Sequence, residues 1–343
     1  MRMKVRIVFF AVAAVWTGVA ARAQEGQIVR LDPGLNALIA PGAKIEKVAD
    51  NFGFVEGPVW VHAGGSGFLI FSDIPANVIN KWNPQDKKAS VYLEKSGFSG
   101  GDPGDAGYQI NNGHATVTLY GSNGITLDKQ GRVTYVTHGD RDVVRVEKDG
   151  KRTVLADKFE GKRLNSPNDL VYKSDGALYF TDPPYGLRKL ADDPKKELPF
   201  EGVYRLAKGK LEVVNKDFQA PNGLAFSPDE KYLYVDDSAS KTYWRFDVQA
   251  DGSLTNKKLL IDMSSSKEAG VPDGMKVDQK GNIYGAGPGG VWVLSPEGRH
   301  LGTIRPPENP ANLAWGDADG KTLYFTAVTG LYRLRMNVPG IRP

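Results

Sequence analysis

Six acidic or amide side chains recur at one position of a repeating pattern, and their types suit them to bind a cation. Each stands at the start of a short run of alternating apolar residues. The six are Glu56, Asn123, Asn168, Asn222, Asp273 and Asn312. If the runs surround a common axis, all six side chains point into one channel. Hard divalent cations such as Ca²⁺ bind such oxygens, six to eight in number. The pattern therefore predicts a metal site with a small ligand above it.

Four of these residues form the expected ligand set. Glu56, Asn168, Asn222 and Asp273 supply two carboxylates and two amide carbonyls. Four protein ligands leave positions open for water or substrate. Catalytic zinc usually recruits histidine, and the four histidines of the chain show no ligand spacing. We therefore expect one divalent cation, Ca²⁺ first, with Zn²⁺, Mg²⁺ and Mn²⁺ as alternatives.

Turn formation is the competing explanation of these positions, because Asn-Gly is by itself a turn dipeptide. The hairpin turns have glycines of their own, however, as in Lys129-Gln130-Gly131. Glu56 is not a turn-forming residue type. The set is therefore better explained by a channel-facing role than by turns.

Repeats indicate the architecture that positions these residues. Groups of four short apolar runs are separated by turn residues; one group reads NGITLDK, RVTYVTHG, DVVRVEKD and RTVLADK. Four-stranded antiparallel units repeated every 40 to 70 residues are typical of a β-propeller, in which the first strand of each blade lines the central channel. Six such groups predict an all-β, six-bladed β-propeller.

Ring closure is expected to use the start of the mature chain. The last group has only three strands before the chain ends, and the segment KIEKVADNF, Lys44–Phe52, precedes the first group. Pairing this segment with the last blade would remove two exposed sheet edges. Residues 24–343 are therefore expected to form a single propeller domain.

The first 23 residues have the layout of a signal peptide. Basic residues precede an apolar run from Ile7 to Val19, and Ala21-Arg22-Ala23 offers small residues for cleavage. The run is too short to span a membrane, although an uncleaved anchor is the alternative. We expect export, to the periplasm in a Gram-negative cell, with no membrane attachment after cleavage.

Charge and cysteine content exclude several classes of function. The signal segment holds four basic residues and no acid, so the formal charge falls from +4 to zero in the mature chain. A nucleic-acid partner is therefore not expected. The chain has no cysteine, which excludes disulfides, thiolate metal sites and cysteine nucleophiles. We expect a monomer that acts on a small molecule.

Further polar residues are candidates for substrate binding. Asn123 shares the register of the ligands, and Asn168 could also contact substrate. His138 ends the second strand of its group, where it contacts substrate or lies on the surface. Tyr185, in Pro-Pro-Tyr-Gly, borders the pocket or forms a tight turn. The acidic pair 236–237 also ends a second strand, either as a partner of the ligands or in an exposed turn.

Two insertions interrupt the repeat, and no helix of ordinary length is expected. Residues 96–122 are rich in glycine and without periodicity; they precede Asn123 and could cover the channel mouth, or be a disordered surface decoration. Residues 189–199 mix charges with proline and are expected to be solvated surface.

Several stretches resemble the gluconolactonase and senescence marker protein (regucalcin, luciferin-regenerating enzyme-like) family. They are VEGPVW (55–60), LNSPNDL (164–170), FTDPPYGL (180–187), APNGLAFSPD (220–229) and VPDGM (271–275). SNGITLD with THGDR is similar to the bacterial gluconolactonase-like branch. The resemblance covers nearly all of the mature chain.

This resemblance implies a six-bladed propeller with one divalent metal in its channel. Glu56, Asn222 and Asp273 match the family's ligands, and Asn168 matches a further asparagine at the metal, as a ligand or through water and substrate. Animal members carry an arginine that holds sugar hydroxyls two residues before that asparagine. This chain has Ser166 at that position, so we expect its contacts with sugar hydroxyls to differ from those of the animal members.

The expected reaction is hydrolysis of a sugar-derived lactone. A cation would polarise the lactone carbonyl and stabilise the oxyanion. The resemblance supports Asp273 as the general base toward water. The alternatives are a phosphotriesterase-like or other ester hydrolase on the same site, and a non-catalytic ligand-binding propeller. A serine hydrolase is not expected, because the chain has no nucleophile elbow.

Overall fold

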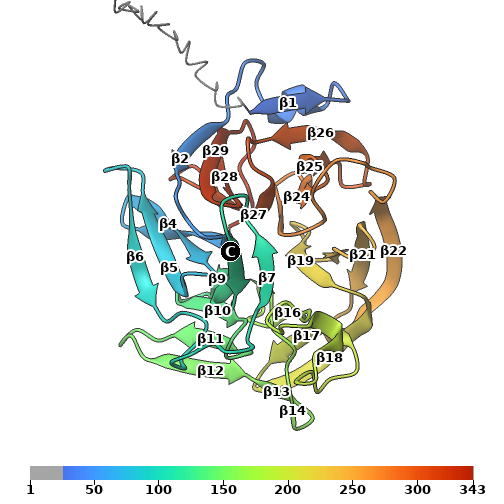
Figure 1. Ribbon diagram of the computed structural model, residues 1–343. Coiled ribbons are helices and arrows are strands. Elements are labelled where there is room, and N and C mark those ends of the chain that lie inside the picture. Colours follow the sequence, from blue (N-terminus) through green and yellow to red (C-terminus); the bar gives the residue numbers. More distant parts are fainter. Residues whose placement is uncertain (1–25, 343) are drawn as a thin grey trace, which may run out of the picture.

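The computed structural model describes residues 26–342, which form six antiparallel sheets around a central axis (Figure 1). Blades 1 and 2 contain β3 (Val55–Ala63), β4 (Ser66–Asp73), β5 (Val78–Asn83) and β6 (Lys88–Glu94), then β9 (Ser122–Leu127), β10 (Val133–Thr137), β11 (Val143–Val146) and β12 (Arg152–Ala156). Blades 3 and 4 contain β15 (Leu170–Tyr172), β16 (Leu178–Asp182), β17 (Glu201–Ala207) and β18 (Lys210–Phe218), then β19 (Pro221–Phe226), β20 (Tyr232–Asp237), β21 (Thr242–Val248) and β22 (Leu254–Asp262). The predicted six-bladed β-propeller is confirmed.

The last two blades recruit strands from the start of the described chain. Blade 5 contains β23 (Met275–Val277), β24 (Ile283–Gly287), β25 (Gly290–Leu294) and β26 (His300–Arg305), with β1 (Gln27–Arg30) as a fifth strand; blade 6 contains β27 (Pro310–Gly316), β28 (Thr322–Ala327), β29 (Gly330–Arg335) and β2 (Glu46–Ala49). In β2, Glu46 pairs with Arg333 of β29, so the predicted N-terminal closure is confirmed. The fifth strand of blade 5 was not predicted.

A short helix explains why β1 docks on blade 5. The helix α1 (Leu35–Leu38) follows β1 and buries Leu35 and Leu38 against Val291 and Ile304 of that blade. Fully burying a leucine stabilises a fold by about 1.5–3 kcal/mol. This local apolar anchor holds β1 beside β26, where Gln27 pairs with Arg305.

The apolar core lies between neighbouring blades. One cluster joins Val59 and Ile70 of blade 1 to Ile125 and Tyr135 of blade 2, and comparable clusters join the other blades. Alternate residues of each strand face these inter-blade layers, as the period of two in the sequence predicts. The packing fixes the blades against one another and so fixes the residues that begin each first strand.

The insertion at 96–122 contains a hairpin that the sequence did not predict. It consists of β7 (Tyr108–Asn111) and β8 (Thr116–Leu119), with Tyr108 paired to Leu119. In Figure 1 this hairpin lies in front of the centre of the ring. The two short strands β13 (Lys158–Phe159) and β14 (Lys162–Arg163) form a second small hairpin before blade 3.

The insertion at 189–199 is only partly solvated surface, so that expectation was wrong in part. It holds the 3₁₀ turn η1 (Leu190–Asp192), and Leu198 is buried in the core between blades 2 and 3. The Lys195 carbonyl accepts a hydrogen bond from the buried Arg141. The segment therefore packs on the propeller through an apolar and a polar contact.

The predicted signal peptide, residues 1–23, lies outside the described residues. Within residues 26–342, the helices are too short for any of them to cross a bilayer.

Candidate active site

Irregular backbone at the start of each first strand turns the site residues toward the axis. The strand register shifts beside the opening residue in blades 1, 2, 4 and 6, for example between Glu56 and Val59. In blades 3 and 5, the regular strand begins only after Asn168 and Asp273. Bulges bend a strand and re-aim its side chains, and they are common beside active sites. The opening residues therefore lie at or beside irregular points of the ladders and can face the channel.

The glycines that follow the opening residues allow neighbouring blades to approach closely. A Cβ at Gly57, which has φ +53°, would lie 2.1 Å from the Asn123 carbonyl oxygen. A Cβ at Gly223 would lie 2.2 Å from the carbonyl oxygen of Asp273. Only glycine fits such contacts. These dipeptides are therefore points of contact around the ring, and the turn interpretation of them is wrong.

Two carboxylates from different blades share one electrostatic environment. Glu56 is 3% exposed, and burial, reinforced by the charge of Asp169, raises its pKa to about 7. Burial and the neighbouring Glu56 charge raise the pKa of Asp273 well above its usual range. Adjacent like charges out of water are unfavourable. A cation between them would remove this repulsion.

Buried amide oxygens without hydrogen-bond partners among the described residues occur at two of the strand openings, those of Asn123 and Asn222. Asn222 donates its Nδ2 to Ser238 Oγ at 3.1 Å, and Ser238 donates to the Pro272 carbonyl at 2.6 Å. This chain fixes the amide orientation and leaves Asn222 Oδ1 without a partner among the described residues. A buried acceptor without a partner costs about 1–3 kcal/mol. The free oxygen therefore indicates a ligand of the site.

Asn168 is linked to the neighbouring strand openings through backbone contacts. It is 4% exposed, its N–H donates to the Thr181 carbonyl at 2.9 Å, and its own carbonyl accepts from Gly124 at 2.9 Å. The Thr181 hydroxyl in turn donates to the Asn222 carbonyl at 2.7 Å. These bonds connect the openings of blades 2, 3 and 4 into one rigid arc.

Asn123 and His138 form a buried pair in blade 2. His138 is 1% exposed, so its placement on the surface, one of the two alternatives, was wrong. Burial lowers the pKa of His138 to about 4, so the imidazole is neutral near pH 7. Its Nε2 lies 3.2 Å from Asn123 Nδ2, and Asn123 Oδ1 has no partner among the described residues. The pair therefore presents a free amide oxygen.

Tyr185 combines both of its predicted alternatives. Its phenol lies near Ser238 and Asp273, and burial raises its pKa above the usual range. The turn that carries it is built by Ser166, whose Oγ donates to the Pro183 carbonyl at 2.6 Å and accepts from the Gly186 N–H at 2.7 Å. The residue that stands in place of the animal-family arginine thus supports the turn that presents Tyr185.

Three residues of the channel were not identified as site residues from the sequence. Asp169 is 2% exposed, and Asn312 Nδ2 donates to it at 3.3 Å; Lys276 Nζ lies 3.9 Å from the same carboxylate. The sequence pattern gives Asn312 the register of the ligands but assigns it no role in the site. Asp169 directly follows Asn168, which is the one sequence signal that could have found it.

The acidic pair 236–237 is buried, so its placement in an exposed turn was wrong. Asp236 Oδ1 accepts from the Gly223 N–H at 3.2 Å, and its Oδ2 has no partner among the described residues. Asp237 accepts from the Gln219 N–H at 2.8 Å. Asp236 therefore supports the opening of blade 4, and Asp237 closes the loop before it.

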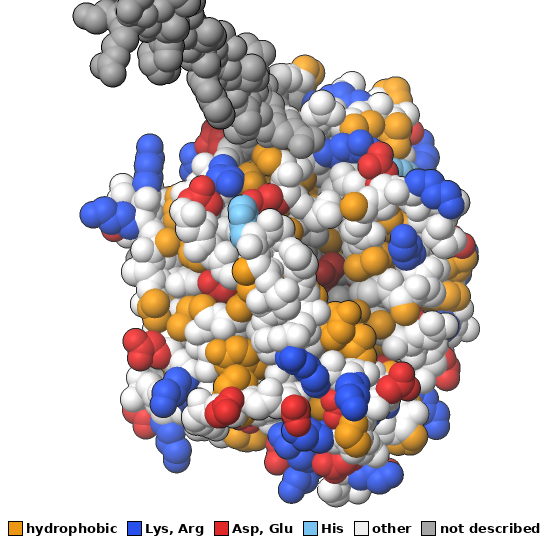
Figure 2. Space-filling model, viewed as in Figure 1, with side chains coloured by type: hydrophobic (Ala, Val, Ile, Leu, Met, Phe, Trp, Pro, Cys, Tyr) orange, Lys and Arg blue, Asp and Glu red, His pale blue; other side chains and the backbone are white. Residues whose placement is uncertain are grey.

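The β7–β8 hairpin is attached to opposite sides of the channel mouth. At one end, the N–H groups of Gly107 and Tyr108 donate to the carbonyls of Gly186 and Tyr185 at 2.7 and 2.9 Å. At its tip, Asn112 Nδ2 donates to the Gly53 carbonyl at 2.7 Å. Figure 2 shows a hollow beside the hairpin with acidic atoms at its floor. The hairpin therefore roofs part of the site.

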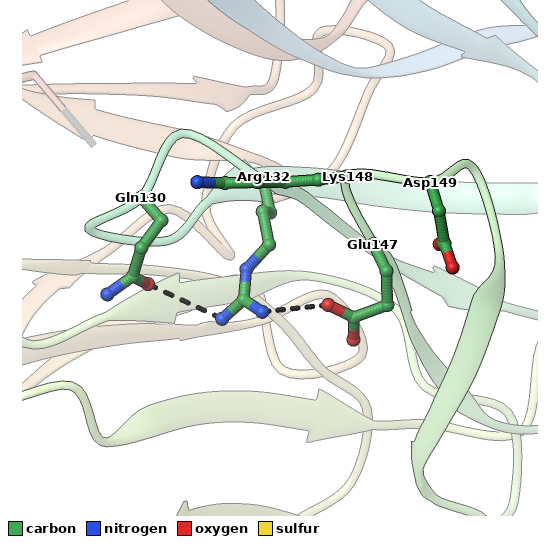
Figure 3. Close-up of a pocket in the computed structure, with 5 residues that line it drawn as sticks. All are labelled: Gln130, Arg132, Glu147, Lys148 and Asp149. Atoms are coloured by element: carbon green, nitrogen blue, oxygen red, sulfur yellow. Dashed lines mark hydrogen bonds and ion pairs between the residues drawn. The ribbon is translucent and has the colours of Figure 1, made fainter.

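A second hollow lies at the turns of blade 2 and carries no catalytic set. Its lining is Gln130, Arg132, Glu147, Lys148 and Asp149 (Figure 3). Arg132 donates to Glu147 Oε2 at 2.7 Å and to Asp128 Oδ2 at 2.7 Å. These ion pairs join the β9–β10 turn to the β11–β12 turn, and the hollow is the space beside them.

The donors at the channel mouth fit a hard cation. The strand openings offer two interacting carboxylates, Glu56 and Asp273, and the unpartnered amide oxygen of Asn222, and Ca²⁺ prefers oxygen ligands. Among residues 26–342, no group of three His, Cys, Asp or Glu side chains has the arrangement of a metal site. Amide oxygens beside the acids are available to complete a ligand set.

Comparison with known proteins assigns the family. The model for the SMP-30/gluconolactonase/LRE-like region matches residues 54–329. A gluconolactonase from Zymomonas mobilis is 37% identical over 92% of this chain and 87% of its own length. Rabbit (Oryctolagus cuniculus) regucalcin is 27% identical, over 79% of this chain and 82% of its own. The structure of a gluconolactonase from Xanthomonas campestris is 30% identical, with a TM-score of 0.74 over 90% of this chain and 94% of that one. The chain therefore belongs to the SMP-30/gluconolactonase/LRE-like family.

Proposed function

We propose that this protein is a lactonase that uses a divalent cation to hydrolyse a sugar-derived lactone. The observation that carries the proposal is the interacting acid pair of buried Glu56 and partly exposed Asp273, together with the unpartnered Oδ1 of Asn222. These oxygens lie at the mouth of a channel in a chain whose relatives include a gluconolactonase with 37% identity. Glu56, Asn168, Asn222 and Asp273 would hold the cation.

A bound cation would supply Lewis acidity to the lactone carbonyl and to the oxyanion that forms on attack. The protein residues orient the substrate and move the protons. Asp273 is the one proposed ligand that keeps partial exposure, whereas the other three are buried. Asp273 can therefore reach a water molecule above the site and act as its general base.

The proton balance of the step is simple. Asp273 takes a proton from water as the oxygen of that water bonds to the lactone carbonyl carbon. The ring C–O bond then breaks, and the proton passes from Asp273 to the departing ring oxygen. The product is an open-chain hydroxy acid, and the carboxylate is regenerated.

Four residues are proposed to bind the substrate: Asn123, Asn168, His138 and Tyr185. Asn123 offers a free amide oxygen, which can accept a bond from a sugar hydroxyl. Tyr185 lies beside Asp273 and is partly exposed. Because Ser166 is engaged within its own loop, these residues replace a guanidinium contact with neutral hydrogen-bonding groups.

Calcium is the cation that we propose, because the donors are all oxygens and no histidine joins them. We also propose that the chain is exported as a monomer, since the signal-like segment precedes a single closed propeller. Mg²⁺, Mn²⁺ and Zn²⁺ remain alternatives to be separated by reloading the stripped protein with each cation in turn.

The proposal is tested with a panel of aldono-γ- and δ-lactones, aryl esters and phosphotriesters. We expect ring opening of at least one aldonolactone, faster than turnover of any ester or phosphotriester. Preferred turnover of a phosphotriester or aryl ester would support the alternative hydrolase. Absence of turnover across the panel by the cation-loaded protein would overturn the enzymatic proposal in favour of a binding protein.

A further inference from the structure

A polar layer crosses the channel directly beneath the proposed ligands. Lys276 of blade 5 donates to Asn312 Oδ1 of blade 6 at 3.2 Å and to the Met275 carbonyl at 2.9 Å. Asn312 Nδ2 donates to Asp169 Oδ2 of blade 3 at 3.3 Å. The Asn312 side chain also lies near Glu56 of blade 1, where it offsets part of the rise that burial causes in the pKa of Glu56. Hydrogen bonds of Lys276 and Asn312 thus join blades 3, 5 and 6, and Glu56 of blade 1 lies beside them.

The ammonium group of Lys276 balances negative charge in this layer. Glu56, Asp169, Asp236 and Asp273 lie close enough to influence one another. Lys276 Nζ stands 3.9 Å from Asp169 Oδ2, and the Asp169 side chain is only 3% exposed. A buried carboxylate is strongly unfavourable unless a partner charge accompanies it. Lys276 provides that charge.

Lys276 also divides the channel into two parts. A cavity of about 340 Å³ occupies the end opposite the hairpin. Its walls come from the first strands of all six blades and from the C-terminal segment; they include Val59, Ile125, Leu170, Leu224, Val277 and Ile341. Lys276 lines this cavity and is 27% exposed by its side chain. The ammonium therefore stands between an open cavity and the carboxylates.

We propose that the ammonium group of Lys276 supplies a permanent positive charge inside the channel. Lys276 is a positioning residue: it balances Asp169, and through Asn312 it holds Glu56 in place for the divalent cation. It also keeps a further cation from entering the cluster of carboxylates from the lower cavity. This inference rests on the metal-dependent function proposed above.

The central test is the number of Ca²⁺ ions bound per chain, measured by calorimetry on the full protein after removal of metal. The variants are Lys276→Met, which removes the charge at similar length, and Lys276→Met with Asp169→Asn, which removes both charges. Lys280→Met, an exposed lysine in the next turn of the same blade, is the matched control.

We expect one Ca²⁺ in the wild-type chain and in Lys280→Met, two in Lys276→Met, and one again in the double variant. One Ca²⁺ in every variant would overturn the inference and leave the proposed function intact. A wild-type chain that binds no divalent cation would instead overturn the metal-dependent function.

A second variant decides the matter if Lys276→Met does not fold. Asp169→Asn leaves the ammonium without its balancing charge beneath the ligands. We expect the Kd for Ca²⁺ to rise by at least about tenfold, because a unit negative charge several ångströms from a divalent cation attracts it by more than that in a medium of effective dielectric constant about 20. An unchanged Kd would contradict the role of Lys276 and Asp169 as a balanced pair.

Discussion

Asp273 and Glu56 are unusual among the residues of the channel because each is an acid held close to further carboxylates. The raised pKa of each has burial as its first cause and a neighbouring carboxylate as its second. A fold retains such a pair against its own stability only where the pair has a use, since perturbed acids cluster at functional sites. The two residues are more than two hundred positions apart in the sequence, and the closed ring brings them together in space.

Replacing Asp273 by Asn should abolish catalysis without loss of the fold. The amide cannot accept the proton of water, so we expect kcat for the lactone to fall by about 10²–10⁴, the usual contribution of a general base. The Tm in chelator should stay equal or rise, because the repulsion from Glu56 is removed. Asp217→Asn, at an exposed acid, is the control; full lactonase activity in Asp273→Asn would refute the assignment.

Replacing Ser238 by Ala should weaken cation binding without touching a proposed ligand. Ser238 Oγ fixes the Asn222 amide at 3.1 Å, and a hydrogen bond of this kind contributes about 0.5–1.5 kcal/mol. We therefore expect the Kd for Ca²⁺ to rise about three- to tenfold, as measured by calorimetry. Ser264→Ala, at an exposed serine on the outer side of blade 4, should leave the Kd unchanged; an equal effect of both substitutions would speak against the orienting role.

At the scale of elements, the site depends on strand irregularities and on one hairpin. Alternation and turn residues predicted the blades and the starts of their first strands, because those signals are local. The bulges, and the approach of Gly57 to Asn123, follow from ring closure and have no local signal. The β7–β8 hairpin was missed because its strands are short, polar and flanked by glycine. Its order comes from contacts with Tyr185 and Gly53.

Replacing Asn112 by Ala should release the tip of the hairpin. Asn112 Nδ2 binds the Gly53 carbonyl at 2.7 Å, and its Oδ1 accepts from the N–H groups of His114 and Ala115. We expect faster proteolytic cleavage within residues 107–119, a several-fold lower kcat/KM for small lactones and a Tm close to wild type. His114→Ala, at an exposed neighbour, provides the comparison; unchanged cleavage and kinetics in Asn112→Ala would show that the tip contact does not hold the roof.

At the scale of the whole molecule, the propeller is a ring whose N-terminal strand closes its last blade. The six-bladed count and the closure by Glu46–Ala49 could be predicted, since the last group visibly lacked one strand. The neighbours of each channel residue could not, because Lys276, Asn312 and Asp169 meet only across the closed ring. His138 is likewise held by a contact that the sequence does not signal, since its N–H donates to the carbonyl of Gly121 in the 96–122 insertion.

Buried acids should make the metal-free protein less stable as the pH rises. Burial is the first cause that raises the pKa of Glu56 to about 7, of Asp182 to about 7 and of Asp142 to about 6. Each acid holds its proton more tightly in the folded chain than in the unfolded chain. Its contribution to the free energy of unfolding is therefore complete below its ordinary pKa and is lost as the pH rises to about 7. In chelator, we expect a higher Tm at pH 5 than at pH 8. The reverse order would contradict the claim that burial raises the pKa values of these acids.

The central claim is that the channel-mouth oxygens hold a cation that the lactonase reaction requires. The most direct measurement follows aldonolactone ring opening by pH-stat, on protein stripped with chelator and then titrated with Ca²⁺. We predict that activity is lost on stripping and returns as one Ca²⁺ binds, together with a rise in Tm, and that neither Ca²⁺ nor another divalent cation restores the rate of Asp273→Asn. An undiminished rate in the stripped protein would contradict the claim.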